Sequence, residues 1–277
     1  MKKYLFVILG IITVSILGLN LDQGTCPLKS AQKSQKSAPI KKGEQGLLLN
    51  EALLLLKNRK DQAALAIFEK ILVSEPENLN ALWGKAEVLR RSRKFKDSEA
   101  ILNNILNKYP YHASSLISLA YIRYKDDKLD AALKLVQQVL RTDNLDKENK
   151  ALAYMMWGAI NSRRSAKGWF FSKIRYGTQI KGYFLKAKEL AADLPEVHLG
   201  LGTFYLLAPA IVGGNLEKAF EELSLAVKMA PDFATANARL AQSYKKKGNK
   251  EKYNYYLQRA KELDPENEVA NEELRNQ

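Results

Sequence analysis

The sequence predicts an all-α protein, a solenoid built from about six helix-turn-helix units. Apolar residues recur at the i, i+3, i+4, i+7 spacing of an amphipathic helix through most of the chain. Similar positions recur every 34 residues, as in the pairs Pro76 and Pro110 and Pro231 and Pro265. Glycine and proline are scarce, at 15 and 8 of 277 residues, which disfavours a β-sandwich or a collagen-like scaffold.

Residues 1–21 are predicted to be a signal peptide or an N-terminal membrane anchor. Tyr4–Leu21 carries no charge and has the length of the shortest spanning helices. No small-residue cleavage pattern follows Leu21, so a cleaved signal and an uncleaved anchor both stay open. Lys2 and Lys3 favour a cytoplasmic N-terminus. We therefore expect an extracytoplasmic protein, secreted or anchored in the bacterial cytoplasmic membrane.

Residues 22–44 are predicted to be a basic flexible tether, because Lys, Ser, Gln and Pro leave little apolar surface to bury. Cys26 lacks the preceding residues of a lipoprotein signal, and whether it is lipidated stays open. A single cysteine excludes an intramolecular disulfide, and with only His112 and His198 it makes a metal centre improbable. We expect no cofactor and no metal.

The repeats occupy residues 45–265, with units that begin near residues 45, 79, 113, 147, 195 and 234. Residues 266–277 are predicted to be a short capping helix and tail. Small residues such as Ala64 and Ala132 recur where paired helices approach, and larger ones such as Phe68 and Leu102 fill the space between them. A proline after the second helix, as at Pro76, Pro110, Pro231 and Pro265, ends that helix before the next unit.

Two units carry a recognisable motif. One reads Leu201-Gly202-x2-Tyr205, then Ala219-x3-Leu223, then Pro231; the other reads Leu240-Ala241-x2-Tyr244, then Tyr253-x3-Leu257, then Pro265. This pattern resembles the tetratricopeptide repeat, a 34-residue helix-turn-helix unit. The resemblance implies a right-handed superhelix whose first helices line a concave groove that binds a partner.

Two insertions interrupt the regular spacing. Near residues 164–178 we expect an enlarged turn between the two helices of the fourth unit. Its candidate binding residues are basic or aromatic: Arg164, Trp169, Phe170 and Arg175. They suit an anionic group, although packing of the aromatic rings against the solenoid is the alternative.

The second insertion lies near residues 209–214, where Pro209, Gly213 and Gly214 are the candidate residues. Proline ends a helix here, and the glycines allow a tight turn before Asn215, which suits a helix N-cap. The segment is similar to a turn in the periplasmic T-component family of TRAP transporters. That resemblance implies a part in transport assembly; a packed loop without a ligand is the alternative.

The first helices of the units project bases and aromatic rings inward, with few acids. The candidate partner-binding residues are Trp83, Glu87, Arg90, Arg91, Tyr121, Tyr124, Lys125, Arg163, Lys245 and Lys246. Such a surface suits a partner protein or an acidic peptide. A solvated basic face is the alternative.

The charge and motifs favour binding over catalysis. The chain carries a formal net charge of +14, of which the first 46 residues, with seven bases and two acids, hold +5. No catalytic residue pattern is recognisable, so no enzyme is expected. We predict a non-catalytic protein-protein interaction scaffold, with membrane contact through the N-terminal segment. The alternative is a periplasmic solute-transport accessory protein that binds a small ligand or a transporter component. Nucleic-acid binding is disfavoured, and self-association stays open.

Overall fold

The computed structural model describes residues 42–276 apart from residues 168–169. The side chains of residues 42–44 and 167–178 also fall outside this description. The predictions for the N-terminal segment and tether, and for the side chains of Trp169, Phe170 and Arg175, therefore lie outside the described residues. Within the described residues, no helix combines the length and the apolar composition needed to cross a membrane.

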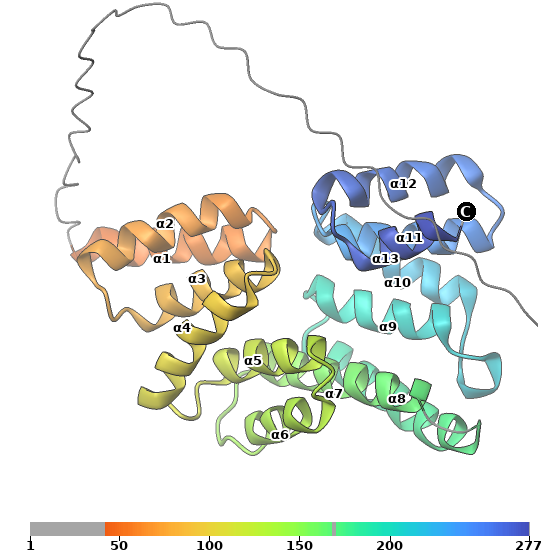
Figure 1. Cartoon of the computed structure of the whole chain (residues 1–277), viewed down its shortest axis with the longest axis horizontal. Helices are drawn as coiled ribbons and strands as arrows, with labels where there is room; N and C mark the ends of the chain where they lie inside the picture. The colour runs from red at the N-terminus through yellow and green to blue at the C-terminus, as the bar shows by residue number, and fades with distance from the viewer. Residues whose placement is uncertain (1–41, 168–169, 277) are drawn as a thin grey trace, which may run out of the picture. The chain divides into compact units, whose positions relative to one another are not determined.

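Helices account for nearly all of the described residues, which confirms the all-α solenoid (Figure 1). They pair in chain order as α1 (Lys42–Lys57) with α2 (Asp61–Ser74), α3 (Leu79–Arg91) with α4 (Phe95–Lys108), α5 (Ala113–Lys125) with α6 (Leu129–Leu140), α7 (Lys147–Lys167) with α8 (Phe170–Leu190), α9 (Pro195–Leu207) with α10 (Leu216–Met229), and α11 (Ala234–Lys246) with α12 (Lys250–Leu263). The short η1 (Ala210–Val212) precedes α10, and α13 (Glu268–Arg275) follows the last pair.

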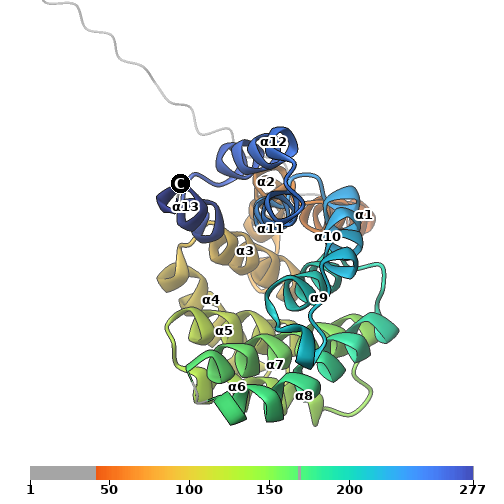
Figure 2. The same ribbon diagram turned by 90° about the vertical axis from the view of Figure 1, so that its right-hand side faces the viewer.

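The helices form two layers. Each odd-numbered helix packs against its own partner and against the next odd-numbered helix, from α1 through α13. Each even-numbered helix from α2 to α12 packs only against the odd-numbered helices on either side of it in the chain, apart from a contact between α8 and η1. The odd-numbered helices therefore make a continuous inner layer and the even-numbered helices an outer one (Figures 1 and 2).

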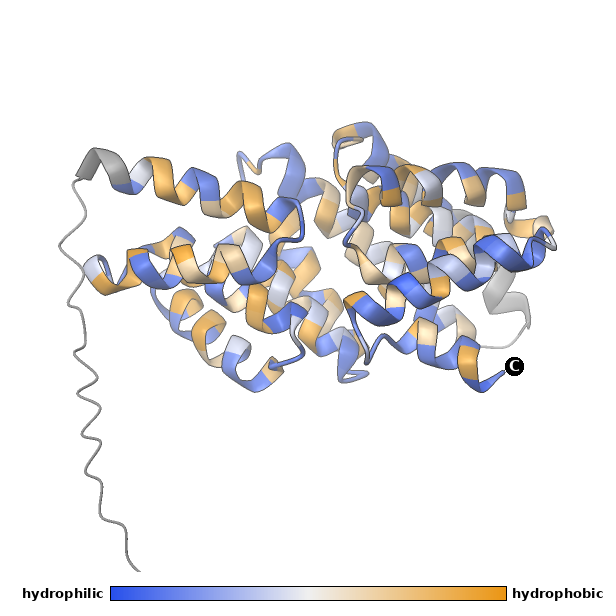
Figure 3. Ribbon diagram, turned by 90° about the horizontal axis from the view of Figure 1, so that it is seen from above, coloured by the Kyte–Doolittle hydropathy of each residue, from blue (hydrophilic) through white to orange (hydrophobic). Residues whose placement is uncertain are grey.

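Apolar side chains line the contacts between these layers along the whole solenoid. Hydrophobic and hydrophilic segments alternate along the helices in Figure 3. In the first two units, Ala64 and Phe68 of α2 are fully buried against α1 and α3. The core is thus repeated from unit to unit, with no single centre.

Gly84 shows how tightly these helices pack. A Cβ added at Gly84 would lie 2.2–2.5 Å from three ring atoms of Phe68. We expect Gly84→Ala to lower the free energy of unfolding by about 2 kcal/mol, since overpacking outweighs the gain in helix propensity. Gly182→Ala on α8 is the matched control, because nothing lies within 4 Å of its added Cβ. Urea unfolding of both variants tests this prediction. Equal stabilisation by Gly84→Ala and Gly182→Ala would contradict the close contact between Gly84 and Phe68.

The fourth unit differs from its prediction. We expected an enlarged turn near residues 164–178, but α7 continues to Lys167 and α8 begins at Phe170, each being 21 residues long. The insertion therefore lengthens two helices. No proline interrupts residues 164–178, and most residue types there tolerate a helix, so the glycines Gly168 and Gly177 were a weak signal for a loop.

Candidate interaction surface

The predicted partner-binding residues come from the inner layer, on α3, α5, α7 and α11. Four of them are brought together at α3 and α5. Trp83 Nε1 lies 3.3 Å from Ser118 Oγ, and that hydroxyl donates to Glu87 Oε2 at 2.9 Å. Arg90 lies over the Tyr121 ring, with its Cζ 4.1 Å from the centroid. These contacts make one hydrogen-bonded and stacked cluster on the inner face.

Glu87 is the centre of this cluster. Arg90 donates to its two oxygens at 2.8 and 2.5 Å, and Arg91 Nε donates at 3.0 Å. Arg91 also donates to Asp61 Oδ1 and to the Leu56 carbonyl, both at 2.8 Å. Burial raises the pKa of Glu87, but Arg90 and Arg91 outweigh it and hold that pKa below its usual range. Glu87, Arg90 and Arg91 therefore neutralise one another within the protein.

Tyr124 and Arg163 form a second contact, between α5 and α7. Arg163 donates to the Tyr124 carbonyl at 3.2 Å, and its guanidinium lies 5.0 Å from the Tyr124 ring centroid. Its Nε is 3.1 Å from Asp127 Oδ1. Arg163 thus has an internal carboxylate partner.

The predicted lysines are also engaged. Lys125 forms an ion pair with Glu268 of α13, and Lys245 lies 2.8 Å from Glu273 Oε2. Lys246 donates to the Leu206 carbonyl at 2.8 Å. The acids that pair with Lys125 and Lys245, Glu268 and Glu273, both lie on α13. The sequence of α5 or α11 alone therefore did not indicate them.

Sequence reasoning missed a set of ion pairs that joins the first units to the last. We call it the charge seam. Its bases lie in or beside the turns that end α1, α3 and α5, and its acids lie at the starts of α9, α11 and α13. The pairs are Lys57 with Asp193, Arg59 with Glu196, Lys60 with Asp232, Arg93 with Asp264 and Glu268, and Lys125 with Glu268.

The turn geometry directs the seam bases. Arg59 and Arg93, 34 residues apart, both have left-handed backbones, with φ of 62° and 60°. In the first turn, the Lys60 N–H bonds to the Leu55 carbonyl at 2.9 Å, which is the longer bond of a Schellman motif. Repetition of this turn brings equivalent side chains of successive units to the same edge, which faces the last units in Figure 1.

Arg59 is the most enclosed member of the seam, with its side chain 11% exposed. Its guanidinium lies 3.7 Å from the centroid of the Phe233 ring and pairs with Glu196 through Nη2. Burial, and secondly the nearby Arg91, lower the pKa of Arg59 to about 10. Its Nε is buried without a hydrogen-bond partner among the described residues. Arg59 is thus an enclosed cation with unused donor capacity.

The described residues of the two insertions have different roles. Arg164 forms an ion pair with Asp130. Gly213 has a φ of 104°, and a Cβ on Gly214 would lie 1.8 Å from the Ala208 carbonyl oxygen, so this turn, which Pro209 begins, requires both glycines. Asn215 then accepts the Lys218 N–H at 2.9 Å and caps α10.

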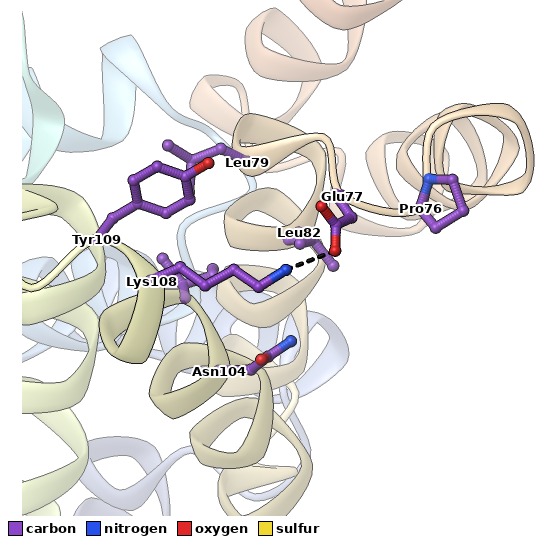
Figure 4. Close-up of a pocket in the computed structure, with 8 residues that line it drawn as sticks. Pro76, Glu77, Leu79, Leu82, Asn104, Lys108 and Tyr109 are labelled. Carbon is purple, nitrogen blue, oxygen red and sulfur yellow. Dashed lines mark hydrogen bonds and ion pairs between the residues drawn. The ribbon is translucent and has the colours of Figure 1, made fainter.

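One small cavity lies away from both insertions, between the start of α3 and the end of α4 (Figure 4). Leu79, Leu82 and Ile105 line its apolar part, and Lys108 bonds Glu77 at 2.5 Å beside it. Its volume is about 190 Å³, below the roughly 300 Å³ at which small-molecule sites begin. The cavity therefore gives no support to a small-ligand site.

The two histidines have structural contacts. His198 is 1% exposed, and its Nε2 lies 2.8 Å from the Ala192 carbonyl while Nδ1 lies 2.7 Å from Glu222. His112 Nδ1 lies 2.7 Å from Ser115 Oγ. In the part of the chain that the structure describes, no group of His, Cys, Asp and Glu is placed to hold a metal ion.

Comparisons with known proteins agree with the two-layer architecture. No family model and no curated protein sequence matches the chain. Among solved structures, human IFIT1 in a dimer with m7Gppp-AAAA matches with a TM-score of 0.59 and 19% identity, over 78% of this chain and 50% of that one. A chain of the APC/C hetero-tetramer Cut9-Hcn1 matches with a TM-score of 0.56 and 14% identity, over 82% and 42%.

The fold is that of a tetratricopeptide solenoid. The Pseudomonas aeruginosa protein PilF also aligns, over 84% of this chain and 97% of its own, with a TM-score of 0.47 and 16% identity. The chain spans half or less of the matched IFIT1 and Cut9-Hcn1 chains. At identities of 14–19%, these similarities support the tetratricopeptide fold and nothing more specific.

Proposed function

We propose that this tetratricopeptide solenoid is a non-catalytic scaffold that binds a partner protein or peptide on its inner layer. The observation that supports this most directly is the continuous row of odd-numbered helices, which presents Trp83, Tyr121 and Tyr124 beside charged side chains. Aromatic rings and arginines are the side chains that contribute most to protein interfaces. The N-terminal 21 residues are proposed to hold it at, or direct it beyond, the bacterial cytoplasmic membrane.

The test uses the full chain, affinity-tagged and expressed in a bacterium, with a Lys245→Glu/Lys246→Glu variant. Both residues lie at the end of α11. Lys134→Glu on α6 is the control, because it is an exposed charge on an outer helix. We expect the wild type and the control to retain one defined partner and the α11 variant to lose it at unchanged helicity. Equal loss in the control, or no partner at all, would count against the inner layer as the binding surface.

A further inference from the structure

The bases and acids of the charge seam are segregated along the chain. Every seam base belongs to the first three units, and every seam acid lies in the first turn of α9 or α13 or in the turn before α9, α11 or α13. The first helix pairs alone therefore present a row of cations: Lys57, Arg59, Lys60, Arg93 and Lys125. The seam acids lie at least 136 residues further along the chain than the bases they pair with, although Lys57 also lies 3.5 Å from Glu148 Oε1 of α7.

Side chains alone hold the seam together. None of the helices α1–α4 packs against any of α9–α13. The pairs differ in exposure: Lys57 and Asp193 are 41% and 67% exposed, whereas Arg59 is 11% exposed and Lys125 16%. Exposed ion pairs each contribute about 0–1 kcal/mol and are screened by salt. Opening of the seam therefore breaks side-chain contacts and leaves the helix packing within the units unchanged. The pairs of Lys57 and Lys60 add little to its cost, and the enclosed Arg59 adds most.

Arg59 indicates what would take the place of the seam acids. It meets Glu196 through one terminal nitrogen, while its buried Nε has no partner among the described residues. A guanidinium binds a carboxylate best through two parallel hydrogen bonds, so the present contact leaves part of its capacity unused. The Phe233 ring that covers this guanidinium is the N-cap residue of α11, so opening of the seam also uncovers Arg59 for such a pair.

We propose that the seam acids are an internal, displaceable ligand for the basic edge of the first three units, and that an acidic segment of a partner protein replaces them. This inference rests on the proposed scaffold function and names the partner's chemistry. Binding of the segment opens the seam, because the same bases cannot serve both sets of carboxylates. The partner must then supply several carboxylates to bases spread over three units.

The test measures binding of a fluorescent twelve-residue Glu/Asp peptide to the full chain in detergent at 150 mM NaCl. The seam variant is Glu196→Gln/Asp232→Asn/Glu268→Gln. The matched control, Glu51→Gln/Glu221→Gln/Glu251→Gln, removes the same charge from exposed helix positions outside the seam. We expect the seam variant to bind about tenfold more tightly than the wild type, and the control less than twofold. Arg59→Ala in the seam variant should remove most of that gain.

A distance measurement separates this proposal from the scaffold function. Spin labels at Asn58 and Asn254, in a Cys26→Ser background, should move apart when the peptide saturates the wild type. Equal affinities in the seam variant and the control, no binding to any variant, or binding without a distance change would each overturn the displacement proposal. The scaffold proposal would still stand if the partner retained by the tagged wild type were lost on Lys245→Glu/Lys246→Glu.

Discussion

Replacing Glu87 with glutamine is expected to lower the free energy of unfolding at neutral pH by about 3–5 kcal/mol, the usual cost of breaking a buried ion pair. Glu87 is 6% exposed, and its loss leaves Arg90 and Arg91 enclosed with fewer counter-charges. Ser118 can still donate to the amide oxygen, but the amide nitrogen cannot accept from Arg90 or Arg91, so the charge and its hydrogen bonds are lost together. Urea unfolding at pH 7 measures the loss.

The same comparison predicts a pH dependence. Burial raises the pKa of Glu87, but Arg90 and Arg91 hold it below its usual value in the folded protein. The contribution of the Glu87 charge to stability is therefore full above about pH 4.5 and declines as the pH falls further. The difference in stability between the wild type and Glu87→Gln should therefore narrow as the pH falls from about 4.5 to about 3. Glu51→Gln, an exposed change on α1, should match the wild type throughout. A constant difference across this range would show that packing, not charge, causes the effect.

Replacing His198 with alanine is expected to cost about 3 kcal/mol at neutral pH. His198 joins the start of α9 to Glu222 of α10 and to the Ala192 carbonyl. Burial raises the pKa of Glu222, but hydrogen bonds from His198 and Lys188 outweigh burial and hold that pKa below its usual value. The carboxylate is therefore ionised at neutral pH. The His198 ring therefore bridges the Ala192 carbonyl and the Glu222 carboxylate. Its removal leaves a cavity and a partly buried carboxylate.

Lys188, 2.6 Å from Glu222 Oε1, still pairs with that carboxylate, which limits the expected loss. His112→Ala is the matched control, because His112 is less buried and bonds only Ser115. Its cost should stay near 1 kcal/mol in the same urea unfolding experiment. Equal costs for the two histidines would contradict the role assigned to His198.

The helix pairs could be predicted because each depends on nearby residues. The 34-residue recurrence of small and large side chains, as at Ala64 and Phe68, is a local property of sequence and sets how neighbouring helices pack. The insertion near residues 164–178 was misjudged because glycines and adjacent aromatics suit a loop as well as a helix. The inserted residues extend α7 and α8 to 21 residues each and do not form a long turn between them.

The electrostatic state of the inner face could not be predicted in this way. Arg59 and Glu196 lie 137 residues apart, and no local pattern relates them. A signal was present in the acids beside the prolines of the last units, as in Pro195-Glu196, Pro231-Asp232 and Pro265-Glu266, opposite the basic turns of the first units. Only the curvature of the solenoid brings these two sets together. The basic inner face predicted from the helices alone is therefore largely neutralised from within.

The seam also changes how stability is distributed along the chain. In a linear repeat protein each unit is supported only by its neighbours, so the end units fray and their amides exchange with solvent first. Here Lys60 is tied to Asp232 and Arg93 to Asp264, across more than 170 residues. The two terminal units therefore support each other as well as their neighbours. Opening of the seam removes this support from both ends at once, so amide exchange should rise together in the first and last units while each unit stays folded.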